Sequence, residues 1–331
     1  MLKAGVIGVG HLGRNHARVY HELPNCELAG ILDIDKDKAR EISAKYSAKS
    51  FDSLDDLLDA CDAVSIVTPT TSHFEIGMRA LETGVHILAE KPMTTTVEQA
   101  ERLLEYAGKK ELTLQVGHIE RFNPAFTSVR DSIKDPLFIE THRLSGFGGR
   151  GIEVDVILDL MIHDIDLILT LAGEEPSEIR CAGAPVLTST SDIANVRLEF
   201  PSGCTANVTA SRISTNPMRK MRIFQKAGYI SIDFAERKSE VYLLTSDAEA
   251  NPDMIPVFSV PFGGEGKSIR AYYPEVKQAD MLEAEIKDFI SSIETGNAPI
   301  VDGRAGLRAL KVANQIIEKL PRIPEDIIAG S

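Results

Sequence analysis

The stretch Lys3-Ala4-Gly5-Val6-Ile7-Gly8-Val9-Gly10-His11-Leu12-Gly13 decides the fold of the first half of the chain. Its apolar part predicts a buried strand, and residues 14–21 predict a helix. Between them lies the pattern GxGxxG, whose glycines permit a tight turn, close approach of a pyrophosphate, and close helix–strand packing. The helix N-terminus adds N–H donors and partial positive charge. We therefore expect a dinucleotide to bind at Gly8, Gly10, His11, Leu12 and Gly13.

A second predicted strand, 27–33, ends in an acidic residue, Asp33. Asp33 follows Gly13 by 20 residues, which is the position of a carboxylate that binds the ribose hydroxyls of a dinucleotide. A carboxylate there accepts the free 2′-hydroxyl of NAD and repels the 2′-phosphate of NADP. No arginine follows directly, so the sequence favours NAD and makes NADP the less expected cofactor.

Helices and strands alternate through the rest of this half. We expect helices at 35–46, 54–59, 72–83 and 96–109, and strands at 63–68, 85–89 and 112–117. Alternation of this kind predicts a Rossmann domain, with a doubly wound parallel sheet, over residues 1–122. Ligands of such sheets bind beyond the carboxyl ends of the strands, which draws attention to Thr68-Pro69 and to Glu90-Lys91-Pro92.

Lys91 is the most informative of these residues. Pro92 holds it in an extended conformation where the strand ends, and the peptide bond between them is a candidate for the cis form. A lysine at this edge, beside the nicotinamide, can donate to a substrate oxygen or take part in proton transfer.

The pattern changes after about residue 122, and residues 123–331 predict an α+β domain for substrate binding and oligomerisation. We expect a helix at 125–133, a strand at 137–144, a helix at 155–172, and strands at 176–187, 192–200, 204–213, 217–226, 229–233 and 238–244. They predict an open, mostly antiparallel sheet with the helix on one face. An irregular segment follows at 245–271. Two further helices, 277–294 and 303–319, close the chain and are candidates to pack back on the first domain.

The expected helix at 155–172 carries an unusual polar stripe. At roughly 100° per residue, its polar residues at spacings of 4, 4 and 3 fall within an arc of about 80°; they are Asp155, Asp159, His163 and Asp166. A solvated helix face has a wider band with Lys, Gln and Ser. A narrow band of carboxylates and one imidazole favours a functional site.

Composition excludes several classes of protein. The 331 residues include 36 Lys and Arg against 49 Asp and Glu, a formal net charge of −13. A general nucleic-acid-binding protein needs a basic field, so we expect no nucleic-acid partner. We also expect no membrane span, because no apolar run reaches about 18 residues. We expect no signal peptide, because the first ten residues, MLKAGVIGVG, lack its basic start and longer apolar core and lead directly into the predicted strand and glycine loop. The four cysteines are scattered, which is typical of reduced thiols in a cytoplasmic protein.

With these residues in place, the chain resembles the Gfo/Idh/MocA oxidoreductase family. The shared motifs occur in both halves and in the family's order: Gly8-Val-Gly-His-Leu-Gly13, Asp33, Thr68-Pro69 with His73, Glu90-Lys91-Pro92, Arg121-Phe-Asn-Pro124 and Asp159-x3-His163-x2-Asp166. Many members have a glycine inside the last motif, whereas this chain reads Asp159-Leu-Met-Ile-His163. We interpret that difference as variation between subfamilies.

The resemblance implies an NAD-dependent dehydrogenase that acts on a CH–OH group. Residues 117–124 and 155–166 look most like members that oxidise the C3 hydroxyl of UDP-N-acetylglucosamine, ahead of transamination to a diamino sugar for lipid A or related glycans. It implies cofactor contacts from Thr68, Pro69, His73, Glu90 and Lys91. For the substrate we expect Lys91, His118, Arg121, Asn123, Arg150, Asp159 and His163. Further candidates for its diphosphate are Arg143, Arg212, Arg219 and Lys220.

Oxidation of a secondary alcohol requires a base, and an imidazole suits that role near neutral pH. His163 lies one helical turn from Asp159, which would fix its tautomer or hold a neighbouring hydroxyl; Asp166 is able to do either job instead. Lys91 would stabilise the developing alkoxide charge. The roles of His163 and Lys91 remain open to reversal.

Three other readings stay open. In the first, the substrate is another sugar, a sugar acid or an inositol. In the second, the chain is a dinucleotide-binding sensor or scaffold without activity. In the third, Asp159, His163 and Asp166 bind a divalent metal. We expect no metal, because the sequence shows no further His or Cys ligand cluster. The open sheet of the second domain predicts a homo-oligomer packed through it. The family resemblance implies that this oligomer is a dimer or a tetramer.

Overall fold

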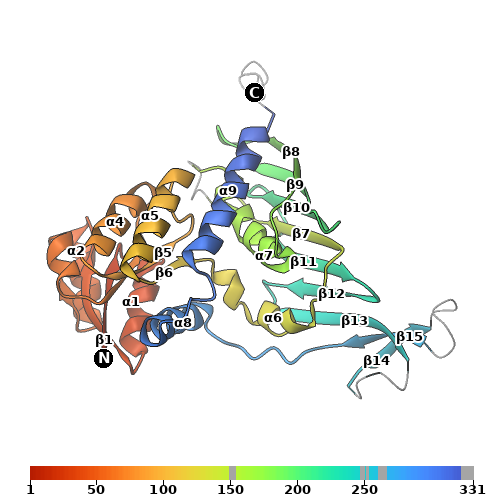
Figure 1. Ribbon diagram of the computed structural model, residues 1–331, viewed down its shortest axis with the longest axis horizontal. Coiled ribbons are helices and arrows are strands. Elements are labelled where there is room, and N and C mark those ends of the chain that lie inside the picture. The colour runs from red at the N-terminus through yellow and green to blue at the C-terminus, as the bar shows by residue number, and fades with distance from the viewer. Residues whose placement is uncertain (149–153, 247–249, 251–252, 260–266, 322–331) are drawn as a thin grey trace. The chain divides into compact units, whose positions relative to one another are not determined.

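The computed structural model describes residues 1–148, 154–246, 250, 253–259 and 267–321. The chain divides into two compact units, each with its own sheet (Figure 1). Unit 1 comprises Met1–Phe122 and Ala279–Lys311, and unit 2 comprises Asn123–Gln278 and the residues from Val312 onward. Unit 1 is therefore built from two separate parts of the chain.

The sheet of unit 1 has six parallel strands in the order β3-β2-β1-β4-β5-β6. They are β1 Leu2–Ile7, β2 Cys26–Leu32, β3 Lys49–Ser50, β4 Ala63–Ile66, β5 His86–Glu90 and β6 Leu114–Gly117. The strand order reverses between β1 and β4, where ligands of doubly wound sheets bind. The predicted Rossmann fold is confirmed. Only β3 was not predicted, because a two-residue strand has no periodicity to detect.

Helices cover both faces of this sheet. They are α1 Gly13–Glu22, α2 Lys36–Lys45, α3 Leu54–Leu58, α4 His73–Glu82, α5 Val97–Lys110, α8 Met281–Thr295 and the part of α9 Gly303–Lys319 that ends at Lys311, with short 3₁₀ turns η1 Thr70–Ser72 and η2 Ile119–Phe122. One face packs Ala63 and Leu88 against Phe289 of α8, which lies beside α1. On the other face, Gly77 of α4 lies close to Ile87 and Leu103.

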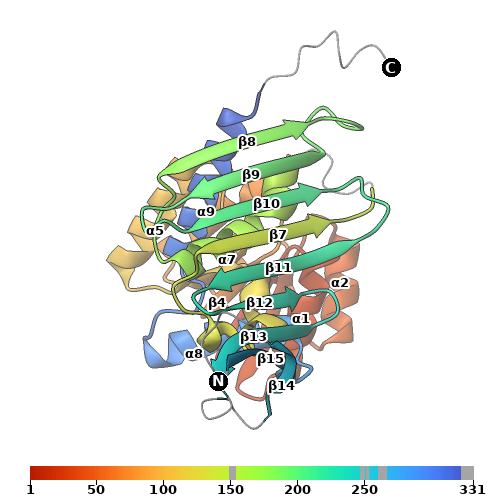
Figure 2. The same ribbon diagram turned by 90° about the vertical axis from the view of Figure 1, so that its right-hand side faces the viewer.

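The sheet of unit 2 has nine strands in the order β14-β15-β13-β12-β11-β7-β10-β9-β8 (Figure 2). They are β7 Phe138–Leu144, β8 Glu178–Ala184, β9 Ile193–Glu199, β10 Thr205–Ser211, β11 Met218–Gln225, β12 Gly228–Asp233, β13 Lys238–Ser246, β14 Ile255–Ser259 and β15 Lys267–Tyr272. Of its pairs, β7 and β10 run parallel and the others antiparallel. The predicted mostly antiparallel sheet is confirmed.

Two predictions for unit 2 need correction. The helix expected at 125–133 is reduced to α6 Pro124–Thr127 and a 3₁₀ turn, η3 Arg130–Ser132. The hydroxyl groups of Thr127 and Ser128 donate to carbonyl groups three residues back and so compete with the helical pattern. The segment 245–271, expected to be irregular, contributes β14 and β15 to the sheet; its Gly-rich part at 260–266 lies outside the described residues.

Candidate active site

The glycine loop between β1 and α1 has the geometry of a dinucleotide cradle. Gly8 has φ +88°, and a Cβ atom on it would lie 2.7 Å from the carbonyl oxygen of Val67. A Cβ atom on Gly13 would lie 1.8 Å from the carbonyl oxygen of Gly8, so only glycine lets the helix start this close. A Cβ atom on Gly10 would meet no described atom within 4 Å. Gly10 therefore leaves open backbone that a pyrophosphate can approach.

Asp33 completes this loop from the end of β2. Its Oδ2 accepts a 2.7 Å hydrogen bond from the Val9 N–H group, and Oδ1 accepts one of 2.8 Å from Asp35. These contacts fix the carboxylate beside the glycine loop. Leu12, the N-cap residue of α1, has no polar side chain to cap the first turn. The residues present fit a bound dinucleotide, with N–H donors for its phosphates and a carboxylate for its ribose.

The segments that follow β4 and β5 are tied together by His73. Its ring is buried, with Nε2 at 2.8 Å from the carbonyl oxygen of Thr68 and Nδ1 at 3.0 Å from that of Pro92. The Lys91–Pro92 peptide bond is cis. Ser72 donates to the hydroxyl oxygen of Thr68 at 2.7 Å. His73 thus supports the predicted cofactor segments from behind, and its own contact with a cofactor stays a prediction.

Glu90, at the end of β5, is held by a buried histidine that the sequence did not single out. The side chain of His16 is 1% exposed, and its Nε2 lies 3.2 Å from Oε1 of Glu90. Oε2 of Glu90 accepts the backbone N–H group of Lys91 at 3.3 Å. Burial raises the pKa of Glu90, but the hydrogen bond from His16 and the charge of Lys91 outweigh it and hold that pKa below its usual range. An ionised carboxylate therefore lies directly before Lys91.

The predicted substrate residues that follow β6 have different surroundings. His118 is buried, and its carbonyl oxygen accepts the N–H group of Arg121 at 3.1 Å, which forms the turn η2. Arg121 is partly buried. Asn123 caps α6, accepting from Ala125 at 3.1 Å and donating to the Phe234 carbonyl at 3.2 Å. These contacts give Asn123 a structural role, and its predicted contact with substrate rests on the resemblance alone. Arg150 lies outside the described residues.

The helix expected at residues 155–172 is not a regular α-helix along its whole length. Ile157–Met161 forms a π-helix, and α7 Ile162–Ala172 continues from it. A π segment adds a residue to the turn, so the 100° spacing across it fails. Asp159 and His163 are partly buried, whereas Asp166 is 2% exposed within a run of buried residues. The stripe is therefore no solvated face. Asp155 precedes the segment, and its Oδ1 accepts a hydrogen bond from the N–H group of Ile157 at 3.0 Å.

Two arginines expected among the diphosphate ligands are held in buried ion pairs of unit 2. Arg143 of β7 donates through Nε to Asp164 at 2.9 Å and through a second nitrogen at 3.0 Å. Arg212 donates through Nε to Asp192 at 2.8 Å and also to the Val154 carbonyl at 2.7 Å. Since the four charged side chains are 4% exposed or less, we correct their assignment from substrate ligands to supports of the helix.

Asp192 was missed by the sequence analysis, although it organises the loop that precedes β9. Its Oδ2 accepts the backbone N–H groups of Val186, Leu187 and Thr188 at 2.6–2.9 Å. Burial raises the pKa of Asp192, but these hydrogen bonds outweigh it and hold that pKa well below its usual range. The signal was the run Leu187-Thr-Ser-Thr-Ser191, whose hydroxyl groups are typical of a hydrogen-bonded loop.

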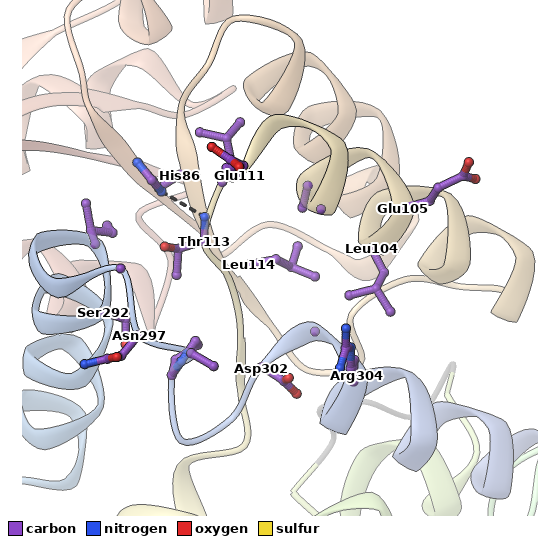
Figure 3. Close-up of a pocket in the computed structure, with 18 of the residues that line it drawn as sticks. His86, Leu104, Glu105, Glu111, Thr113, Leu114, Ser292, Asn297, Asp302 and Arg304 are labelled. Carbon is purple, nitrogen blue, oxygen red and sulfur yellow. Dashed lines mark hydrogen bonds between the residues drawn. The ribbon is translucent and has the colours of Figure 1, made fainter.

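A hollow of about 880 Å³ lies in unit 1, at the amino ends of β5 and β6 (Figure 3). In it the Thr113 N–H group donates to Nδ1 of His86 at 2.9 Å, and burial lowers the pKa of His86. None of the predicted site residues lines this hollow. Doubly wound sheets bind ligands at the carboxyl ends of their strands, so we do not assign the hollow as the active site.

The fold and the residues of unit 1 define the class of protein, an NAD-binding oxidoreductase with a lysine at the end of β5. Two family models match the chain. The model described as "Oxidoreductase family, NAD-binding Rossmann fold" matches residues 2–118, and the "GFO/IDH/MocA C-terminal domain" matches residues 142–231. The chain belongs to the Gfo/Idh/MocA family of oxidoreductases, and the resemblance read from its motifs is confirmed.

Relatives with known names extend the comparison along the whole chain. UDP-N-acetylglucosamine 3-dehydrogenase of Acidithiobacillus ferrooxidans is 38% identical over 95% of this chain and 96% of its own. A solved structure of that enzyme has a TM-score of 0.86, covering 96% of this chain and 97% of its own. Myo-inositol 2-dehydrogenase of Thermotoga maritima is 25% identical over 93% of each chain. The chain is therefore an NAD-dependent dehydrogenase by family and by fold.

Two further observations concern what the described residues do not contain. None of the helices in the described ranges combines the length and the apolar character that a membrane crossing needs. Within the same ranges, no group of three or more His, Cys, Asp and Glu side chains is arranged to hold a metal ion.

Proposed function

We propose that this dehydrogenase oxidises the C3 hydroxyl of UDP-N-acetylglucosamine to a ketone, with NAD as the hydride acceptor. The observation that carries the proposal is the similarity to UDP-N-acetylglucosamine 3-dehydrogenase, which runs through both units at 38% identity over 95% of the chain. A ketone at C3 is the substrate form that an aminotransferase needs, so the product fits a route to a diamino sugar in lipid A or a related glycan.

The chemistry requires a base and a group that stabilises negative charge on the reacting oxygen. We assign the base to His163, because an imidazole exchanges protons near neutral pH. Asp159, in the π segment before it, orients His163 or holds a neighbouring hydroxyl of the sugar. Lys91 supplies the positive charge at the end of β5. In the reversed assignment Lys91 takes the proton and His163 donates to the oxygen.

The diphosphate of the substrate needs cationic or N–H partners. Arg121 is the strongest remaining candidate because it is partly buried and lies in η2, directly after β6. Arg219 and Lys220 of β11 are exposed, and Lys220 forms an ion pair of 3.2 Å with Asp233. His118 precedes η2 and is the proposed contact for the sugar.

The test is NADH formation, followed by absorbance, across UDP-sugars, free hexoses, hexose phosphates, sugar acids and inositols. A partner aminotransferase is added to trap the ketone where the equilibrium opposes oxidation. We expect UDP-N-acetylglucosamine to give the largest kcat/KM, and NAD to exceed NADP. Higher kcat/KM on an inositol or a free sugar would replace the proposed substrate, and NAD binding without turnover on any of them would favour a sensor. Lys91→Met should lose most activity.

We also propose that copies of the chain associate through the open face of the unit 2 sheet. Four neighbouring strands place a row of aromatic side chains there: Phe138, Phe224, Tyr229 and Tyr242. Successive ring centroids are 6.0, 5.5 and 4.5 Å apart. An apolar row on a sheet that Figure 2 shows face on is typical of an interface.

Light scattering should give a dimer or tetramer, and Tyr229→Glu should shift it toward the monomer. Tyr106→Glu is the matched control, because Tyr106 is a partly buried tyrosine of α5 in unit 1. A wild-type monomer would contradict the proposal.

The cytoplasm is the proposed location, supported by four cysteines that are all free thiols, three of them buried.

A further inference from the structure

A cluster of polar side chains lies inside the face of the unit 1 sheet that α1 and α8 cover. Parallel pairing places Ser65 of β4 beside Leu88 of β5, and Leu88 beside Gln115 of β6. Glu90 lies two residues after Leu88 and so points to the same face. The cluster comprises His16 and Tyr20 from α1, Ser65, Glu90, Gln115 and, from α8, Glu285; five of the six are 1% exposed or less.

Three hydrogen bonds in this cluster point toward Glu90. The Tyr20 hydroxyl lies 2.8 Å from Oγ of Ser65, and Oγ lies 3.1 Å from Nδ1 of His16. Nε2 of His16 lies 3.2 Å from Oε1 of Glu90. Burial raises the pKa of Tyr20, so its hydroxyl keeps its proton and donates. Oγ of Ser65 therefore lies between the Tyr20 hydroxyl and Nδ1 of His16, and Nε2 of His16 faces Glu90, so each hydroxyl and ring nitrogen in the chain has a hydrogen-bond partner.

The end of this chain is shaped to hold a carboxylate. Gly117 is the register partner of Glu90 on β6, and a Cβ atom on it would lie 2.9 Å from Oε2 of Glu90. Glycine therefore makes room for the carboxylate against β6. With Oε1 bound to His16 and Oε2 bound to the Lys91 N–H group, Glu90 is fixed on three sides.

The second carboxyl group of the cluster is in the opposite charge state. Glu285 is fully buried, and burial, followed by the charges of Glu90 and Asp288, raises its pKa well above the usual range. Glu90 keeps its negative charge and Glu285 keeps its proton. The two neighbouring acids therefore differ in charge, and only Glu90 of the pair is an anion.

We propose that Glu90, aimed by the chain Tyr20–Ser65–His16, is a positioning residue that keeps Lys91 in its ammonium form at the end of β5. The proposal rests on the role of Lys91 in the proposed function and deepens it. Among the described residues, the groups that interact with Glu90 are His16 from α1, Glu285 from α8, and Lys91 itself. Since Glu285 is neutral, Glu90 is the carboxyl group of this cluster whose negative charge acts on Lys91. An ammonium ion is a poor base, so proton abstraction falls to His163.

The direct test is competitive acetylation of the Lys91 amine across a range of pH, in the complete chain without NAD or sugar, with the peptide quantified by mass spectrometry. Glu90→Gln should lower the titration midpoint of Lys91 by about 1 pH unit or more, because a neighbouring anion is removed. Glu285→Gln is the matched control. The protonated Glu285 of the wild type and the glutamine that replaces it are both neutral, so the titration midpoint of Lys91 should equal that of the wild type.

Thermal unfolding shows which variants are folded. If Glu90→Gln does not fold, His16→Leu takes its place, and it should move the midpoint in the same direction by a smaller amount. An unchanged midpoint in the folded variant, or an equal shift in Glu285→Gln, overturns the proposal. In the oxidation assay, the alkaline limit of kcat should move to lower pH in Glu90→Gln. Because acetylation needs no substrate, a shifted midpoint without sugar oxidation would reject the proposed function and keep this one.

Discussion

Replacing Glu285 with methionine should stabilise the protein. Glu285 lies in α8 with no exposed surface, and neither of its carboxyl oxygens has a hydrogen-bond partner among the described residues. A buried polar group without a hydrogen bond costs about 1–3 kcal/mol. Methionine has a similar length and fills irregular apolar space. Glu285→Met should therefore raise the free energy of unfolding by about 1–3 kcal/mol at neutral pH.

The gain should depend on pH in a defined direction. The folded chain holds a proton on Glu285, because its pKa is raised, whereas the unfolded chain releases that proton above its ordinary pKa. The stability that this proton contributes is fully present below the ordinary pKa of a glutamate, and it is lost as the pH rises through the folded pKa. Methionine carries no such proton. The advantage of Glu285→Met should thus be smallest near about pH 4 and largest near about pH 8.

Urea unfolding followed by circular dichroism, at several pH values, measures this difference. The matched control is Glu283→Met on the same helix, where the side chain is 42% exposed and forms an ion pair with Lys287. That exchange should change the free energy of unfolding by less than about 0.5 kcal/mol. A Glu285→Met variant that is less stable than the wild type at about pH 8, or whose gain is the same at every pH, would refute the reasoning.

Three other changes test the rest of the molecule. His163→Asn should lower kcat by about 100- to 10,000-fold with little change in the Kd of NAD, and near-wild-type turnover would remove His163 as the base. Gly13→Ala places a methyl group 1.8 Å from the Gly8 carbonyl oxygen, so calorimetry should show NAD binding lost; wild-type binding would contradict the cradle. Asp192→Asn leaves buried Arg212 without its anion and should lower the free energy of unfolding by about 3–5 kcal/mol. Because the pKa of Asp192 is depressed, its contribution is present above the ordinary range of an aspartate and lost below it, so the loss in this variant should shrink in acid.

The parts of the fold that the sequence predicts well are those set by near neighbours. The glycine loop and the strand before it depend on residues within a few positions of one another, and the spacing of the glycines predicts the turn geometry. Asp33 lies 24 positions from its partner Val9, but it was predicted because a dinucleotide-binding carboxylate has a fixed spacing from the glycine motif. The parallel, doubly wound sheet of unit 1 followed from the alternation of strands with helices, whereas the order of its strands is known from the structure.

The parts that resisted prediction depend on contacts between distant residues. Arg143 finds Asp164 across 21 positions and Arg212 finds Asp192 across 20, and no helix or strand period relates residues so spaced. The π segment at Ile157–Met161 also has no local signature, and it changes which residues of the stripe are buried. The only sequence feature that pointed to a buried role for His16 is its position one helical turn before Tyr20 on α1.

The return of α8 to unit 1 has a consequence for how the protein is made. The face of the first sheet that carries Ala63 and Leu88 is covered by Phe289, which the ribosome adds only after all nine strands of the second sheet. Domains generally fold from the N-terminus during synthesis. In this protein, Ala63 and Leu88 of the first domain therefore lack their cover from α8 until nearly the whole chain has been synthesised. A chain that stops at Gln278 should therefore expose that face and aggregate.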